Sequence, residues 1–192
     1  MEIKDFTKNY IERLSTLLQE MDLNVIDYIV KTFEATLETK GTIYMLGNGG
    51  SAATASHWAN DFAIGLKRRG IISLDVRSLA DNTPVCTAIA NDIGYENIFK
   101  AQLEDRLKPC DIVFAISCSG DSPNIINAVE YAKKIGSTVI GATGFSGGIL
   151  KEIADIKFHV ATPKGEYGLV EDVHMILDHI IYSYYIQKSI KS

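Results

Sequence analysis

A histidine and an aspartate stand four residues apart just after a glycine-rich stretch. The pair is His57 and Asp61, and the stretch is Gly47-Asn-Gly-Gly-Ser51. On a helix, residues at i and i+4 leave the same face about one turn apart, so these two side chains can hold a metal or move protons together. By spacing alone, the commoner alternative is a half-buried structural histidine beside a solvated aspartate. The residues before the pair favour chemistry.

The glycine-rich stretch has the features of an anion cradle. An apolar run from Thr42 predicts a strand, and a helix rich in small residues is predicted to start at about Ser51. Glycines let the backbone turn sharply and approach a ligand closely, while the free N–H groups at a helix start point at the same place. Ser51 is expected to cap the helix and offer its hydroxyl to the anion, together with the backbone of residues 48–50.

A second loop repeats this arrangement farther along the chain. Ser117-Cys-Ser-Gly-Asp-Ser122 follows the apolar run 111–116 and precedes a predicted helix that ends at about Ile135. Serine and glycine here are also typical of an ordinary turn and cap. Two such loops at the carboxyl ends of parallel strands nevertheless favour a shared ligand site.

The first loop also satisfies a dinucleotide-binding pattern. Gly47-x-Gly49-x-x-Ala52 follows a strand, and Asp75 closes the run 71–75, where a ribose contact is expected. Two hydroxyl-rich cradles suit a small sugar phosphate better than a dinucleotide. We therefore expect no NAD, and an NAD-dependent enzyme is the weaker alternative.

Strand and helix alternate through the middle of the chain. Further strands are predicted at 71–76, 138–142 and 156–160, with helices from 83 to about 94, at 96–107 and at 148–154. Two amphipathic helices precede the first strand, at 3–21 and from 22 to about 37, and a final helix runs from about Leu169. This predicts an α/β fold with a doubly wound, mostly parallel five-stranded sheet, extra N-terminal helices and a long C-terminal helix.

The composition of the chain limits the classes of protein to which it can belong. The chain has 192 residues, of which 46% are hydrophobic and 22% charged, and its net charge is −5. This predicts a single domain over residues 1–192 and no basic field for nucleic acid. Three irregularly spaced cysteines predict no disulfide framework, which suits the cytoplasm. Since no apolar run is long enough to cross a bilayer, no membrane partner is expected.

Together these motifs resemble the sugar isomerase (SIS) domain family and, within it, the phosphoheptose isomerases. The resemblance rests on the two loops and His57, on Asn91 and Asp92, and on Glu171 with His179. It implies an aldose–ketose isomerase that converts sedoheptulose 7-phosphate to D-glycero-D-manno-heptose 7-phosphate through an enediol(ate), for surface polysaccharide. It also implies a homotetramer, with residues 1–40 packed at the subunit interface.

The resemblance further implies a role for each site residue. Asp61 and His179 would be catalytic, and zinc would be held by His57, Asp61, Glu171 and His179. Substrate-binding positions would be Asn48, Gly49, Gly50, Ser51, Asn91, Asp92, Ser117, Cys118, Ser119, Ser122 and Glu171.

Two of these residues depart from the family pattern, which commonly has glutamate at position 61 and glutamine at position 171. We expect Asp61 to shorten the base by one methylene and Glu171 to add a negative charge to the metal site. Two alternatives stay open: an isomerase of another sugar phosphate, and a non-catalytic SIS protein that binds sugar phosphates as a sensor or regulator.

Overall fold

A five-stranded parallel sheet forms the centre of the protein. The computed structural model describes residues 2–190. The strands are β1 (Thr42–Gly47), β2 (Asp75–Ser78), β3 (Ile112–Ser117), β4 (Thr138–Phe145) and β5 (Ile156–Ala161). They lie in the order β2-β1-β3-β4-β5, and every neighbouring pair is parallel. The prediction of a doubly wound, five-stranded α/β fold is confirmed.

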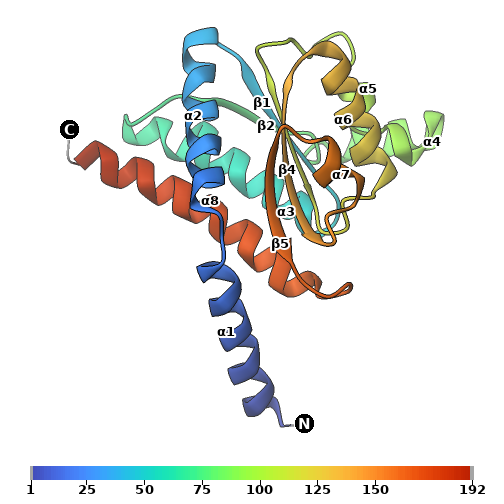
Figure 1. Cartoon of the computed structure of the whole chain (residues 1–192). Helices are drawn as coiled ribbons and strands as arrows, with labels where there is room; N and C mark the ends of the chain where they lie inside the picture. The colour runs from blue at the N-terminus through green and yellow to red at the C-terminus, as the bar shows by residue number, and fades with distance from the viewer. Residues whose placement is uncertain (1, 191–192) are drawn as a thin grey trace.

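Helices cover both faces of the sheet (Figure 1). On one face lie α2 (Leu23–Thr39), α3 (Gly50–Ala59) and α8 (Tyr167–Ile190), and on the other lie α5 (Lys100–Leu103), α6 (Pro123–Ile135) and α7 (Gly148–Ile153). The side chains of each strand alternate between the two faces of the sheet, so the hydrophobic core has two halves. Ile43 and Met45 pack toward α3 and α8, whereas Tyr44 and Leu46 pack toward α6, because successive side chains of a strand point to opposite faces.

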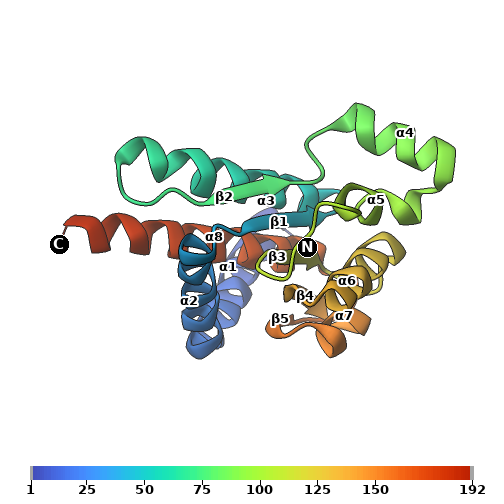
Figure 2. The same ribbon diagram turned by 90° about the horizontal axis from the view of Figure 1, so that it is seen from above.

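The helix α3 and the helix α8 run side by side in the same direction, as both views show (Figures 1 and 2). After Ala59, α3 continues as a π-helical turn at Asn60–Gly65 and a 3₁₀ turn at Lys67–Arg69. No local pattern in the sequence predicts the π turn. It re-aims the residues that follow His57, and such turns are frequent at functional sites.

Two predicted elements differ from the structure. The strand expected at 71–76 begins at Asp75 instead, and the helix expected at 96–107 is a 3₁₀ turn at Tyr95–Asn97 followed by the short α5. Glu104, with a ψ of 136°, leaves the helical conformation after Leu103, and Asp105 follows with a left-handed φ of 60°.

The shifted start of β2 places Asp75 away from the position that the dinucleotide alternative requires for a ribose contact. Asp75 lies opposite Thr42, the first residue of β1, and its carboxylate accepts hydrogen bonds from Thr42 and Arg77. This is the sheet edge away from the two glycine and serine loops. Asp75 therefore begins a strand rather than ending one, and the weaker dinucleotide alternative loses its ribose contact.

Two helices stand apart from the sheet. The helix α4 (Thr83–Ile93) begins at the cap Asn82, whose side chain accepts a hydrogen bond from the Val85 N–H, and it projects away from the core (Figure 2). The helix α1 (Ile3–Gln19) extends from the opposite end of the molecule (Figure 1) and has no buried residue. Within residues 2–190, no helix combines the length and apolar character that a membrane crossing requires.

Candidate active site

The two predicted loops meet at the carboxyl edge of the sheet and enclose a hollow of about 140 Å³. Its lining residues come from the ends of β1 and β3 and from the starts of α3, α6 and α8. They are Asn48, Ser51, Ile116, Ser117, Cys118, Ser119, Ser122, Tyr167 and Glu171. Hydroxyl groups and helix N–H groups therefore converge on one small polar space, which suits a phosphate.

In the first loop, Gly49 rather than Ser51 occupies the N-cap position of α3. Gly49 has a φ of 54°, which glycine adopts without strain. The prediction that Ser51 caps the helix was wrong, since Ser51 lies inside the first turn. There its side chain is buried and lines the hollow.

All three serines of the second loop line the hollow, and two of them also hydrogen-bond within the turn. The Ser117 hydroxyl accepts a hydrogen bond from the Gly120 N–H at 3.1 Å, and Ser119 accepts one from the Asp121 N–H at 3.3 Å. Ser122 precedes α6 but makes no side-chain cap bond. Its hydroxyl is therefore available to a ligand.

A pair of asparagines joins the two loops. Asn48 and Asn124 each donate an amide hydrogen bond to the other, at 2.9 and 2.8 Å, and the Tyr95 hydroxyl donates to Asn48 at 2.9 Å. Asn124 is buried. Sequence reasoning missed Asn124, Tyr95 and Tyr167. For Asn124 the available signal was a polar residue that directly follows the Ser122-Pro123 helix start.

Cys118 lines the hollow but is not a nucleophile. Burial, together with the nearby Glu171 carboxylate, raises the pKa of its thiol to about 11. The thiol therefore stays protonated and unreactive at neutral pH.

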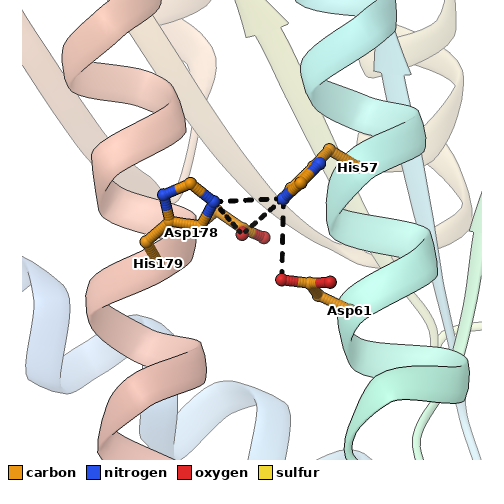
Figure 3. A group of neighbouring side chains, drawn as sticks. All are labelled: His57, Asp61, Asp178 and His179. Carbon is orange, nitrogen blue, oxygen red and sulfur yellow. Dashed lines mark hydrogen bonds and ion pairs between the residues drawn. The ribbon is translucent and has the colours of Figure 1, made fainter.

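A second group of side chains faces across the gap between α3 and α8 (Figure 3). It consists of His57, Asp61, Asp178 and His179, whose ligand atoms all lie within 4.8 Å of one another. The two imidazole Nε2 atoms are 3.1 Å apart, and the His57 Nε2 atom lies 3.6 Å from Asp61 Oδ2 and 3.7 Å from Asp178 Oδ2.

These separations fit a bound divalent cation. Ligands at about 2.1 Å from a tetrahedral zinc lie about 3.4 Å from one another. Two imidazoles and two carboxylates also form a donor set that zinc and similar metals accept.

Asp178 is the member of this group that sequence reasoning missed. Its side chain is fully buried, and neither carboxylate oxygen has a hydrogen-bond partner within residues 2–190. Burial, followed by the charge of Asp61, raises the pKa of Asp178 to about 8. A buried carboxylate with these neighbours needs a cation or a proton. The sequence does contain a signal for Asp178. It is an acidic residue in an apolar helical stretch, directly before the predicted site residue His179.

Asp61 owes its position to the π turn. It is the second residue of that turn, and its Oδ1 atom accepts a hydrogen bond from the Asn60 amide at 2.9 Å. The Asp61 side chain is 14% exposed, whereas Asp178 is sealed. Of the two carboxylates, only Asp61 can therefore reach a substrate.

Some predicted site residues lie outside the hollow or outside the His/Asp group. Glu171 lies in the hollow with the serines and is not in the group of Figure 3. Asn91 and Asp92 lie on the projecting α4, where Asn91 donates a hydrogen bond to Asp92, and neither lines the hollow.

Comparison with known proteins places this arrangement in a family. The sequence profile of the SIS domain matches residues 5–144. This chain belongs to the SIS domain family. The phosphoheptose isomerase of Trichlorobacter lovleyi is 33% identical over 186 residues, which cover 93% of each chain.

Solved SIS-domain structures agree with the fold. The phosphoheptose isomerase from Francisella tularensis superposes with a TM-score of 0.86 at 26% identity, covering 97% of this chain and 100% of that one. The phosphoheptose isomerase GmhA from Neisseria gonorrhoeae gives 0.83 at 26% identity, covering 96% and 97%.

A larger hollow of about 430 Å³ lies elsewhere on this SIS domain, over the outer surfaces of α5 and α6. It is lined by Lys100, Glu104, Asn127, Glu130, Tyr131 and Lys134. No strand end or glycine-rich loop reaches it. Ligands of open α/β sheets bind beyond the carboxyl ends of the strands, so chemistry rather than size identifies the smaller hollow as the site.

Proposed function

We propose that this chain is an aldose–ketose isomerase that converts sedoheptulose 7-phosphate to D-glycero-D-manno-heptose 7-phosphate. The product would supply heptose for surface polysaccharide. Membership of the SIS family and the similarity to phosphoheptose isomerases over nearly the whole chain support this proposal.

One observation carries the proposal: the anion cradle and the His/Asp group lie at successive levels of the same two parallel helices. Gly50 and Glu171 are neighbours at the first level, and His57 and Asp178 are neighbours at the second. Seven residues of α-helix rise about 10 Å. With C–C bonds of about 1.5 Å, an extended seven-carbon chain ending in a phosphate also spans about 10 Å. The phosphate and the carbonyl of such a sugar can therefore bind at the two levels together.

The second level contains what proton transfer requires. Asp61, the accessible carboxylate, would take the proton from one carbon and return it to the next, and His179 would exchange a proton with the sugar oxygen. His57 and Asp178 would hold a metal with these two residues, and we propose zinc. A bound zinc would act as a Lewis acid that stabilises charge on the substrate oxygens.

The decisive experiment is turnover of sedoheptulose 7-phosphate by the metal-replete protein, with Asp61→Asn as the matched variant. We expect formation of the aldose phosphate by the native chain and a loss of at least a hundredfold in kcat for the variant, because the amide cannot accept the proton. Thermal unfolding checks that the variant is folded. No turnover by the native chain would contradict the proposed function, and full activity of Asp61→Asn would remove Asp61 from the mechanism.

We also propose a cytoplasmic homotetramer in which residues 1–40 pack between subunits of a single-domain chain. All three cysteines are free, which suits a reducing compartment. Apolar side chains at Ile3, Phe6 and Ile11 are exposed on α1. An apolar hollow of about 300 Å³ lies between α2 and α8. Such surfaces mark contacts with another protein, and a second copy supplies a matching one.

A further inference from the structure

A chain of hydrogen bonds fixes the orientation of the Asn48 side chain. The backbone N–H of Ile125 donates to Asn124 Oδ1 at 3.0 Å. Because a backbone N–H can only donate, the atom beside it is the oxygen of the Asn124 amide, and the Asn124 nitrogen then donates to Asn48 Oδ1 at 2.8 Å. The Asn48 nitrogen returns a hydrogen bond to Asn124 Oδ1 at 2.9 Å. The two amides therefore have one mutual orientation.

Tyr95 completes the hydrogen bonds at the Asn48 oxygen. Its hydroxyl donates to the same Oδ1 atom at 2.9 Å. An amide oxygen has two lone pairs, and the Asn124 amide and the Tyr95 hydroxyl use both of them. An amide nitrogen carries two hydrogens, and within residues 2–190 a protein acceptor takes only one of those on Asn48. Asn48 is thus left with a hydrogen-bond donor, and no free acceptor, at the wall of the hollow.

The helix α6 holds both of these partners in place. Asn124 is the second residue of α6 and is 1% exposed. Three residues later, on a neighbouring position of the same face, Asn127 donates a hydrogen bond at 3.0 Å to the carbonyl oxygen of Glu96, in the 3₁₀ turn that also contains Tyr95. The turn that carries Tyr95 is therefore attached to the helix that carries Asn124.

We propose that Asn124 and Tyr95 are positioning residues that hold Asn48 as a hydrogen-bond donor to the phosphate of the substrate. Neither residue lines the hollow, so both act through Asn48. A phosphate dianion offers only acceptors, which a fixed donor suits and an amide oxygen would repel. This inference rests on the proposed function, because it takes the hollow as the phosphate site.

The first test is calorimetric titration of inorganic phosphate into the full-length protein and its Tyr95→Phe variant. Tyr95 is 57% exposed, so the loss of its hydroxyl leaves the core packing intact. We expect phosphate to bind the variant at least threefold more weakly, because one of the two bonds to the Asn48 oxygen is gone. Equal phosphate affinity of Tyr95→Phe and the native chain would overturn the proposal.

The matched control is Tyr131→Phe on α6. The Tyr131 hydroxyl makes no hydrogen bond within residues 2–190, and the residue lines the larger hollow instead. The phosphate affinity of this variant should stay within twofold of that of the native chain.

A double variant tests whether Tyr95 acts through Asn48. Asn48→Ala removes the whole contribution of the amide, so Asn48→Ala/Tyr95→Phe should bind phosphate as weakly as Asn48→Ala alone. A further loss in the double variant would give Tyr95 a separate role and overturn the proposal. Asn124→Ala should weaken phosphate binding more than Tyr95→Phe does, because it removes both bonds between the amides. Thermal unfolding checks that this buried substitution still folds.

The kinetics separate positioning from a general loosening of the site. With sedoheptulose 7-phosphate, Tyr95→Phe should raise KM at least threefold and leave kcat within twofold, because a contact to the phosphate is present in the ground state and the transition state alike. A fall in kcat with unchanged KM would contradict the positioning role.

The phosphate titration does not depend on turnover, so the two proposals can fail separately. Weaker phosphate binding by Tyr95→Phe, without any turnover of sedoheptulose 7-phosphate by the native chain, would leave the positioning role standing and remove the isomerase. Turnover by the native chain together with native phosphate affinity in Tyr95→Phe would do the reverse.

Discussion

At the residue scale, Asp178 is the least expected feature of the site. An ionised carboxylate that is sealed from water and unpaired is strongly unfavourable. Asp178 is sealed and has no hydrogen-bond partner among the described residues, but two imidazoles lie within 4 Å of its Oδ2 atom. A divalent cation between these groups would remove the conflict. The burial of Asp178 is thus better explained by metal binding than by stability of the metal-free chain.

This explanation predicts that Asp178→Asn weakens metal binding. Replacing a charged ligand by a neutral amide should lower zinc affinity at least tenfold. Metal content after dialysis against buffered zinc measures the effect, and the rise in melting temperature on adding zinc should shrink in parallel.

The control is Asp172→Asn on the same helix, whose carboxylate accepts a hydrogen bond from Tyr10 and lies outside the group. Zinc content equal to that of the native chain in Asp178→Asn would show that Asp178 is not a ligand.

At the scale of elements, α1 packs on the core mainly through its second half, where Leu14, Leu17 and Leu18 are partly buried. It is attached to the start of α8 by the Tyr10 to Asp172 hydrogen bond, at 2.6 Å, and to the preceding loop by the ion pair of Arg13 with Glu166. Its first turns leave Ile3, Phe6 and Ile11 exposed, and a short helical stretch without packing is marginal in water. Its exposed apolar stripe therefore supports an assembly in which another subunit covers α1.

If α1 packs between subunits, Phe6→Glu should disrupt the assembly. Burying a carboxylate at an apolar contact is costly, so we expect smaller species in sedimentation velocity at micromolar concentration. Asn9→Glu on the polar face of α1 makes the same charge change and should leave the assembly intact. Identical sedimentation of Phe6→Glu, Asn9→Glu and the native chain would exclude α1 from the interface.

At the scale of the whole molecule, a buried histidine connects α8 to the sheet. The His174 Nε2 atom lies 3.3 Å from the carbonyl oxygen of Thr143 on β4, and its ring contacts Phe158 on β5. Its other ring nitrogen, Nδ1, has no hydrogen-bond partner in the part of the chain that the structure describes. Burial lowers the pKa of His174 to about 4, so the folded protein holds the imidazole neutral.

Stability should therefore decline in mild acid. The ordinary pKa of histidine is 6.5, so between pH 6.5 and 4 the unfolded chain binds a proton that the folded chain does not. Stability is fully present above this window and is lost as the pH falls through it, by roughly 1 kcal/mol per pH unit from this residue.

Denaturant unfolding at several pH values measures this slope. In His174→Gln, whose amide can still donate to Thr143, the contribution should disappear. Parallel pH profiles for the two proteins would contradict the assignment.

The sequence alone determined the fold and most of the cradle. Continuous apolar runs such as Ile43 to Leu46 identify strands with two buried faces, and glycines before a helix identify the loop at Gly49, because these signals are local. The spacing of His57 and Asp61 is local too. All of them depend on residues within about one or two helical turns of one another.

Only the tertiary structure decided how α8 completes the site. Residues 171 and 178 are seven apart, about two turns, so helical periodicity lets either one face α3. The packing of α8 beside α3 places Asp178 in the group with His57, which lies more than 100 residues earlier in the chain, and places Glu171 in the cradle. The π turn that positions Asp61 likewise has no local signal. Long-range packing selects among positions that the sequence pattern leaves equivalent.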